Sequence, residues 1–172
     1  LENFDCEHNE INEYFKKEAS QKDGSNTAKT FVLINSENIV GFYTLTVDSI
    51  DVRNLETQTS IKCPIVNLAY FAIDKKYQRR GYGSLLMQEV FRSVSVISYY
   101  TGVEQIYLES VDDSIGFYES LGFQLVTPNL KPEFYKGPTD NIPFPMYISI
   151  HTLLEQGYAG YSKNFENVKI KE

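Results

Sequence analysis

A short glycine-containing segment near the middle of the chain has the residue types needed to bind a phosphate group. Gly81 and Gly83 are separated by one residue, and four cations lie just before them. Glycine lacks a Cβ atom, so the backbone can turn tightly and its N–H groups can approach an anion closely. A helical pattern follows directly, so unpaired N–H groups at the positive end of a helix dipole would face the same anion. The segment Gln78–Ser84 therefore predicts a backbone-amide cradle for a pyrophosphate. The four cations are Lys75, Lys76, Arg79 and Arg80.

Other glycine motifs fit this segment less well. A dinucleotide-binding G-x-G-x-x-G would need glycine where Leu86 stands, and a P-loop would need Gly-Lys-Ser/Thr. Ser84 lacks the G-x-S-x-G spacing of a hydrolase nucleophile. Alternatively, the glycines form only a tight turn between strand and helix, and the arginines are solvated without binding phosphate. A tight turn alone does not require the neighbouring cations, however.

The elements around this segment follow from the hydrophobic pattern. The dense apolar run Ile65–Asp74 is typical of a buried strand in the middle of a sheet. Apolar residues then recur every three or four positions, which predicts a helix over Gly83–Ile97. The cradle therefore lies between a central strand and the start of a helix.

The first part of the chain predicts one helix and one hairpin. Apolar spacing indicates a helix from Asn9, which can cap it, through Ala19, ending before Gly24. β-Branched and aromatic residues then predict an antiparallel pair of strands. These strands are Thr30–Ile34 and Ile39–Ile50.

Short elements continue to the end of the chain. Asp112 and Asp113 can cap a short helix that Gly122 would end. Five of the six prolines lie between Thr127 and Pro145, which predicts a long loop that could line a pocket. Strands or extended segments are expected at Gln105–Glu109, Phe123–Val126 and Met146–Ile150, with a turn or two of helix at His151–Gln156.

Composition favours a single globular domain that is neither exported nor in a membrane. The chain has 172 residues, no apolar run of transmembrane length and no basic, apolar leader pattern, so a cytoplasmic location is expected. The net charge of −7 opposes broad binding to nucleic acid. Cys6 and Cys63 lack C-x-x-C spacing and are expected to be buried thiols, and His8 and His151 lie far apart, so no metal site is expected.

Three segments together resemble the GNAT acetyltransferases. Gln78-Arg79-Arg80-Gly81-Tyr82-Gly83 matches the family signature Q/R-x-x-G-x-G/A, and Leu68–Asp74 resembles the family's central strand. Phe117-Tyr118-Glu119-Ser120-Leu121-Gly122-Phe123 matches F-Y-x-x-x-G-F. The resemblance implies an α/β (α+β) fold with a mixed, mostly antiparallel sheet of about six to seven strands and about four helices. It also implies acetyl-CoA as cosubstrate and no metal.

The resemblance also implies domain limits and a binding site. It covers residues 1–150 as one domain, with 151–172 as a tail, and a first strand is expected to lie before Leu1. The backbone of the central strand should pair with the pantetheine arm and stabilise the oxyanion near Phe71 or Ala72. Many family members have an Asn where this chain has Val111, so that side-chain contact should be missing. The expected acetyl-CoA-binding residues are Phe71, Ala72, Ile73, Gln78, Arg79, Arg80, Gly81, Tyr82, Gly83, Ser84 and Ser114.

Tyr118 is the proton donor that the resemblance implies for the departing thiolate. Its spacing from Ile115 equally predicts a ring packed in the core, and both roles are compatible. No residue stands out as general base: Glu109, Asp112 and Asp113 lie near the expected site, but carboxylates before a helix are more often caps. Water or the acceptor's own ionisation equilibrium can serve instead.

The first part of the chain resembles the toxin-type branch of the family. Members of that branch acetylate aminoacyl-tRNA and pair with a small antitoxin. The net charge of −7 disfavours tRNA binding by this chain, because the tRNA backbone is also negatively charged. The wider hypothesis is acetyl transfer to a primary amine of a small molecule, peptide or aminoacyl group. A CoA-binding regulatory domain without turnover is a third hypothesis, and a homodimer stays open. The matching segments are Phe4-Asp5-Cys6, Ile11-Asn12-Glu13-Tyr14-Phe15, Ala19-Ser20-Gln21, Thr30-Phe31-Val32-Leu33 and Gly41-Phe42-Tyr43-Thr44-Leu45.

Overall fold

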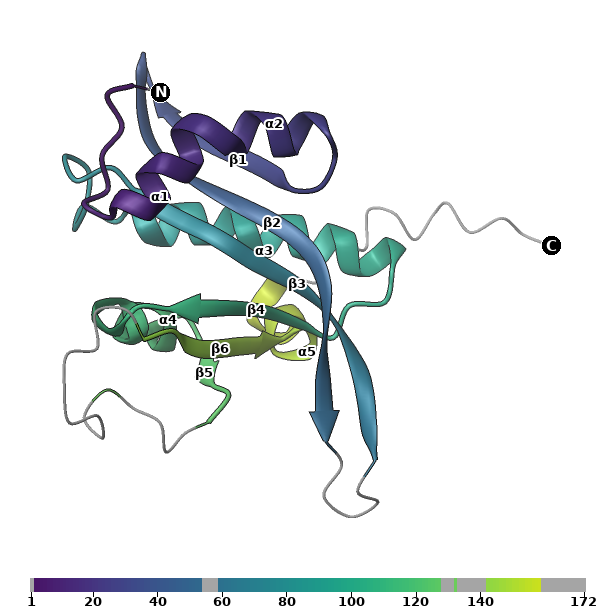
Figure 1. Cartoon of the computed structure of the whole chain (residues 1–172). Helices are drawn as coiled ribbons and strands as arrows, with labels where there is room; N and C mark the ends of the chain where they lie inside the picture. The colour runs from purple at the N-terminus through teal and green to yellow at the C-terminus, as the bar shows by residue number, and fades with distance from the viewer. Residues whose placement is uncertain (1, 54–58, 128–131, 133–141, 159–172) are drawn as a thin grey trace. The chain divides into compact units, whose positions relative to one another are not determined.

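The chain forms a mixed α+β fold, in agreement with the predicted fold class. The computed structural model describes residues 2–53, 59–127, 132 and 142–158. Its six strands form a mostly antiparallel sheet in the order β1-β2-β3-β4-β6-β5 (Figure 1). Two compact units divide the chain: Leu1–Val47 with Asn67–Ser93, and Asp48–Val66 with Val94–Glu172. We call them unit 1 and unit 2.

Unit 1 begins with the predicted helix, which is interrupted by a wider turn. α1 (Asn9–Glu13) and α2 (Ala19–Gly24) are joined by a π-helical turn at Tyr14–Glu18. The prediction that Asn9 caps the helix is wrong by one residue: His8 holds the N-cap position, and its side chain makes no capping bond. The helix also includes Gly24 rather than ending before it.

The predicted hairpin is confirmed, with longer strands. β1 (Lys29–Asn35) pairs with β2 (Asn38–Arg53), and Phe31 lies opposite Tyr43. In unit 1, β2 is buried on both faces. Phe42 stacks on Phe15 with ring centroids 4.0 Å apart, whereas the Tyr43 hydroxyl lies 2.9 Å from Ser93 Oγ, the two atoms sharing a hydrogen bond.

The strand and helix beside the cradle extend beyond their predicted limits. β3 covers Ser60–Ile73 and α3 covers Tyr82–Tyr100. The run before Ile65 was not predicted as strand because it lacks the dense apolar pattern of the later residues, and within it only Cys63 is buried. α3 starts one residue earlier than predicted, so Gly83 lies inside its first turn. The order of strand, glycine turn and helix is confirmed.

Unit 2 holds the predicted short elements, with one correction. β4 (Gln105–Ser110) leads to a 3-10 turn at Asp112–Ser114 and then to α4 (Ile115–Ser120). Asp112 and Asp113 are not helix caps: they lie within the 3-10 turn, and the N-cap positions belong to Val111 and Ser114. Gly122 ends the helix as predicted, with φ of +95°.

The last strands of unit 2 pair in a regular antiparallel register. β6 (Phe144–Ser149) lies between β4 and β5 (Gln124–Leu125), and Met146 is opposite both Leu108 and Leu125. β6 starts before the predicted Met146, because the carbonyl of Pro145 can still accept a 2.9 Å bond from Val126 N–H. The predicted loop between Thr127 and Pro145 lies mostly outside the described residues.

The chain returns to helix after β6, as predicted. α5 (Ile150–Leu153) is capped by Ser149, whose hydroxyl accepts a 3.0 Å bond from Thr152 N–H, and a π-helical turn follows at Leu154–Tyr158. Ile150 therefore belongs to the helix and not to the strand. Within the described part of the chain, no helix is both long and apolar enough to span a bilayer.

Candidate functional site

The predicted cradle contains two residues with a left-handed backbone conformation. Between the end of β3 and the start of α3, Arg79 and Gly81 have φ of +57° and +83°. Glycine populates this left-handed region without steric cost. A Cβ added to Gly81 would have no atom within 4 Å, so the space beside it is open. Gly83 has no positive φ, so only one of the two predicted glycines makes the turn.

The start of α3 supplies hydrogen-bond donors at the same place. Leu85 N–H donates to the Gly81 carbonyl at 3.1 Å. Helix geometry leaves the preceding N–H groups of Tyr82, Gly83 and Ser84 without an intrahelical acceptor. Arg80 is exposed beside them, as is Arg79. Donors, helix dipole and cations therefore coincide, which is the arrangement that binds phosphate groups.

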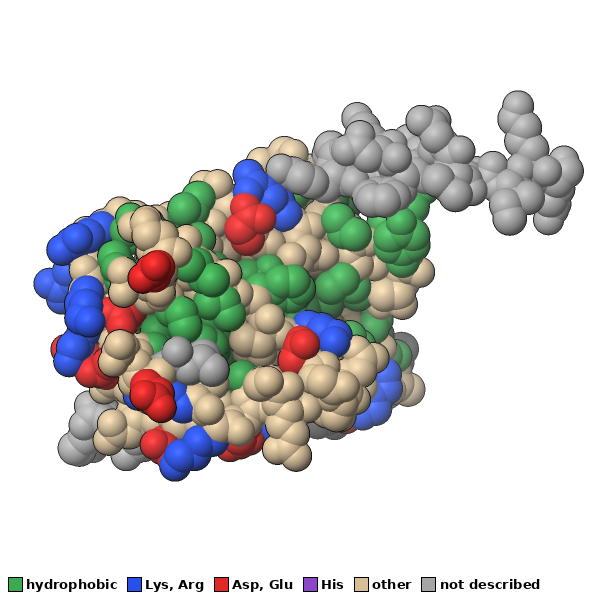
Figure 2. Space-filling model, turned by 90° about the horizontal axis from the view of Figure 1, so that it is seen from above, with side chains coloured by type: hydrophobic (Ala, Val, Ile, Leu, Met, Phe, Trp, Pro, Cys, Tyr) green, Lys and Arg blue, Asp and Glu red, His purple; other side chains and the backbone are tan. Residues whose placement is uncertain are grey.

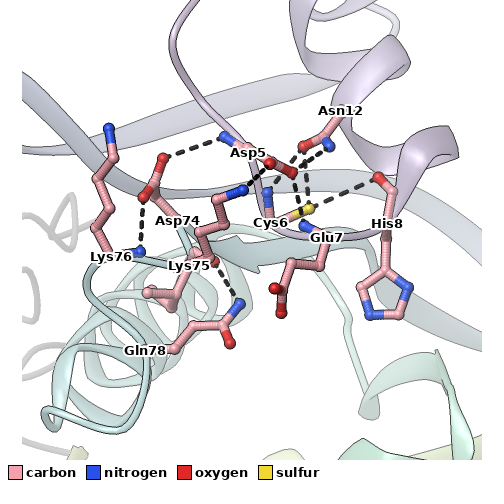
Figure 3. A network of polar contacts seen from close by, with 10 residues as sticks. Asp5, Cys6, Glu7, His8, Asn12, Asp74, Lys75, Lys76 and Gln78 are labelled. Carbon is pink, nitrogen blue, oxygen red and sulfur yellow. Dashed lines mark hydrogen bonds and ion pairs between the residues drawn. The ribbon is translucent and has the colours of Figure 1, made fainter.

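One of the four predicted cations is already neutralised within unit 1. Lys75 Nζ lies 2.6 Å from Asp5 Oδ2, and this carboxylate holds the pKa of Lys75 above its ordinary value. Lys76 is exposed, and its backbone N–H donates to Asp74 Oδ1 at 2.9 Å (Figure 3). The prediction that all four cations are available to bind an anion is therefore wrong for Lys75.

The end of β3 is fixed by hydrogen bonds on both sides of the turn. Asp74 N–H donates to the Val40 carbonyl at 2.9 Å. Gln78 Nε2 donates to the Ile73 carbonyl at 3.1 Å, so this predicted ligand side chain holds the loop to the strand. Ala72 and Ile73 are buried and Phe71 is partly buried. Pairing of their backbone with a pantetheine arm stays a prediction.

Gly41 on β2 allows a close approach to this end of β3. A Cβ on Gly41 would lie 2.6 Å from the Ala72 carbonyl oxygen and 2.5 Å from Ile73 Cδ1. We predict that Gly41→Ala destabilises the fold by about 1–3 kcal/mol, the usual cost of overpacking. It should also weaken acetyl-CoA affinity, because the Ala72 backbone must move. Thermal denaturation and calorimetric titration measure both, and Gly24→Ala, with open space around it, is the control.

Tyr118 lies in unit 2, on α4, and its ring is packed in the core. The side chain is 8% exposed and its ring contacts Phe117 and Phe123 edge-on, with centroids 5.2 and 5.7 Å away. Burial raises the pKa of the Tyr118 hydroxyl well above its ordinary value, so this group stays protonated at neutral pH. The predicted core position is confirmed, and the proton-donor role stays a prediction.

The other predicted residues of unit 2 show no strong catalytic signature. Ser114 is half-buried at the N-cap of α4 and makes no side-chain capping bond there. Glu109 is exposed and accepts a 3.4 Å bond from the Tyr107 hydroxyl. Burial, followed by the Glu109 charge, raises the pKa of Tyr107. Among the described residues of unit 2, burial does not single out a carboxylate as general base.

Cysteine and histidine positions agree with their expected structural roles. Cys6 and Cys63 are free and buried. His8 is exposed, and His151 is an exposed neighbour of Glu155 at 3.1 Å. Among the described residues, no group of three His, Cys, Asp or Glu side chains is placed to hold a metal ion.

A partly buried polar network beside the cradle was not predicted from the sequence. Asp5 and Asn12, before and within α1, connect to Asp74 and Lys75 at the end of β3 (Figure 3). Both residues lie in segments that resemble the toxin-type branch, but the resemblance did not indicate what either residue does. Only the three-dimensional contact relates positions separated by 69 and 70 residues.

Comparison with known proteins gives the class of the chain. The acetyltransferase (GNAT) domain family matches residues 26–125, more than half of the sequence. The chain belongs to the GNAT acetyltransferase family. It is therefore an acyltransferase that uses acetyl-CoA, as the cradle and the sequence motifs predicted.

Solved toxin structures share this fold at low sequence identity. A point mutant of the toxin AtaT is 18% identical with a TM-score of 0.75, covering 90% of this chain and 85% of that one. A point mutant of KacT is 22% identical with a TM-score of 0.73, covering 90% and 89%. AtaT complexed with acetyl-methionyl-tRNA is 19% identical with a TM-score of 0.72, covering 90% of each chain. AtaT has also been solved with the C-terminus of the antitoxin AtaR and acetyl-CoA.

Proposed function

We propose that this chain transfers the acetyl group of acetyl-CoA to a primary amine, with the diphosphate held at Gln78–Ser84. The left-handed turn at Gly81, with open space on its Cβ side, carries the proposal. The N–H groups of Tyr82, Gly83 and Ser84 bind diphosphate oxygens, and Arg79 and Arg80 balance their charge.

The remaining predicted residues position the acyl end. The backbone of Phe71, Ala72 and Ile73 pairs with the pantetheine arm like an added strand, and Ser114 contacts the same substrate. A strand N–H near Phe71 or Ala72 stabilises negative charge that develops on the carbonyl oxygen. Acetyl-CoA supplies the activated thioester carbonyl.

Tyr118 handles the proton of the transfer. A C–N bond forms between the acceptor amine and the acetyl carbon, the C–S bond breaks, and the electron pair leaves with sulfur. The ordinary pKa of tyrosine already exceeds that of a thiol, and burial raises the pKa of Tyr118 further, so proton donation from its hydroxyl alone is uphill. The hydroxyl therefore works as a relay: it gives its proton to sulfur and regains one from the acceptor nitrogen.

The test is stoichiometric acetyl transfer by the whole chain. With acetyl-CoA and a panel of amines, aminoacyl esters and peptides, we expect CoA thiol release matched by acetylated amine in mass spectra. Acetyl-CoA binding in calorimetry without thiol release from any acceptor would favour the CoA-binding regulatory domain instead. Absence of acetyl-CoA binding would overturn the proposed function.

A second candidate specifies the acceptor as the α-amino group of aminoacyl-tRNA. The similarity to AtaT with acetyl-methionyl-tRNA supports it, since it extends over 90% of the chain and beyond the family domain. The acidic charge is also uneven. Unit 1 holds nine Lys and Arg against ten Asp and Glu, whereas unit 2 holds seven against thirteen. Unit 1, which carries the cradle, is thus almost neutral.

Contacts to tRNA in this candidate are local and not spread over a broad basic surface. Figure 2 shows acidic and basic side chains interspersed on one face. A small contact area gives a weak salt dependence, because few counterions are released. The exposed Arg79 and Arg80 can contact a phosphate backbone or CoA.

We predict that the chain acetylates charged tRNA in vitro and arrests growth when expressed in the cytoplasm. The measurement is acetyl-aminoacyl-tRNA in acid gels, with translation followed in parallel, and Tyr118→Phe as the inactive control. A small antitoxin encoded with the chain should restore growth and bind the purified protein. Unchanged translation together with acetylation of free amines would reject this acceptor and keep the wider proposal. A homodimer, the remaining partner prediction, is tested by light scattering.

A further inference from the structure

The loop that carries the cradle needs a constraint from outside itself. It contains two left-handed residues, and one of them, Arg79, has a side chain that disfavours this conformation. Its own bonds lie at its two ends: Tyr77 N–H and Lys76 N–H donate to the Asp74 carbonyl and carboxylate at 2.8 and 2.9 Å, Gln78 Nε2 donates to the Ile73 carbonyl, and Leu85 N–H donates to the Gly81 carbonyl. Strained backbone persists only where its surroundings fix it.

Asp5 supplies contacts to both residues at the base of this loop. Its backbone carbonyl accepts from Lys75 N–H at 2.8 Å, and its backbone N–H donates to Asp74 Oδ2 at 3.1 Å. Its carboxylate also binds Lys75 Nζ at 2.6 Å (Figure 3). Backbone and side chain thus hold the first turn of the loop together.

Asn12 in turn fixes Asp5. Asn12 Nδ2 donates to Asp5 Oδ1 at 3.0 Å, and Asn12 Oδ1 accepts from Cys6 N–H at the same distance. Asn12 is only 9% exposed, and Phe4 and Cys6 on either side of Asp5 are buried in the core of unit 1. The lysine, a backbone N–H and the Asn12 amide lower the Asp5 pKa well below its ordinary range, so the carboxylate stays charged.

We propose that Asp5 and Asn12 are positioning residues that hold the diphosphate-binding loop in its binding conformation before acetyl-CoA arrives. This inference rests on the proposed acetyl-CoA site at Gln78–Ser84. Neither residue needs to touch the ligand. They reduce the ordering that binding would otherwise require, which raises affinity by preorganisation.

Asp5→Asn separates positioning from simple charge effects. Removing a negative charge near an anion site should tighten binding if charge alone matters. Positioning predicts the opposite, because the ion pair to Lys75 is lost and the loop loosens. We expect Kd for acetyl-CoA and for inorganic pyrophosphate to rise about tenfold, a typical single-interaction effect. Asn12→Ala should do the same. Glu13→Gln removes an equivalent charge from the exposed pair with Lys17 and should leave both constants unchanged.

Hydrogen exchange of the ligand-free chain gives a reading that does not depend on binding. In Asp5→Asn, the amides of Lys75, Lys76 and Tyr77 should exchange about tenfold faster, with no change in the core of β2. Lys75→Met, at a half-exposed side chain, should fold normally and show the same acceleration.

Unchanged exchange in both variants, or equal or tighter pyrophosphate binding by folded Asp5→Asn, would overturn the positioning role. Failure of the wild-type chain to bind acetyl-CoA would instead count against the proposed function. Exchange in the same samples would still report whether Asp5 orders the loop.

Discussion

Tyr118→Phe is expected to lower kcat for acetyl transfer by about 10²–10⁴-fold, the usual contribution of a positioned proton-transfer group. The substitution removes one oxygen and keeps the ring, whose edge-on contacts with Phe117 and Phe123 maintain the core. Acetyl-CoA affinity should stay the same, because the proposed diphosphate site at Gln78–Ser84 lies elsewhere in the chain. Single-turnover thiol release and calorimetric titration separate these two quantities.

Tyr43→Phe is the matched control for this prediction. It also removes a hydroxyl from a buried tyrosine, here one bonded to Ser93 Oγ at 2.9 Å. Loss of that bond should reduce stability by about 0.5–1.5 kcal/mol and leave kcat unchanged. Equal turnover of Tyr118→Phe and the wild-type chain would show that Tyr118 is only a core residue.

Local sequence was sufficient for the elements that surround the cradle. The strand ending at Ile73, the turn at Gly81 and the helix continuing to Tyr100 each have a strong one-dimensional pattern. Apolar periodicity and the need for glycine at positive φ act within a few residues, so a single sequence shows them. The hairpin of β1 and β2 followed from its β-branched and aromatic residues in the same way.

A contact between distant segments explains the correction for Lys75. The local sequence predicts Lys75 as an unpaired cation, but Lys75 forms an ion pair with Asp5, 70 residues earlier. Gln78 reads as part of a ligand motif, yet its amide bonds to the Ile73 carbonyl. The partner of Lys75 depends on how α1 packs against β2 and the end of β3, which no local pattern specifies, whereas the Gln78 amide bonds within its own loop, to a carbonyl five residues away.

The π-helical turn at Tyr14–Glu18 could not be predicted from the sequence either. Apolar spacing around it fits an ordinary helix, and a π turn differs by only one added residue. Its effect is visible in packing: Tyr14 stacks on Tyr70 at 3.6 Å, and Phe15 stacks on Phe42. Both stacked residues, Tyr14 and Phe15, lie within the π-helical turn.

Gly81→Val is expected to weaken acetyl-CoA binding at least about 100-fold, which corresponds to roughly 3 kcal/mol. A β-branched residue at φ of +83° is strained, so the backbone must rotate and its N–H groups turn away from the diphosphate. The protein itself has room, since no atom lies within 4 Å of the added Cβ. The fold should therefore persist while the site is lost. Calorimetric titration of acetyl-CoA and thermal denaturation of the same samples measure the two effects.

A graded series separates strain from occupation of the site. Gly81→Ala adds only the left-handed penalty of about 1–2 kcal/mol, so its affinity should fall roughly tenfold. Gly102→Val places the same bulk at an open glycine without positive φ and should bind like the wild-type chain. If Gly81→Val also binds normally, the diphosphate does not lie against this turn. The assignment of the cradle would then fail, because its donors are useful only when the backbone at Gly81 turns them toward one anion.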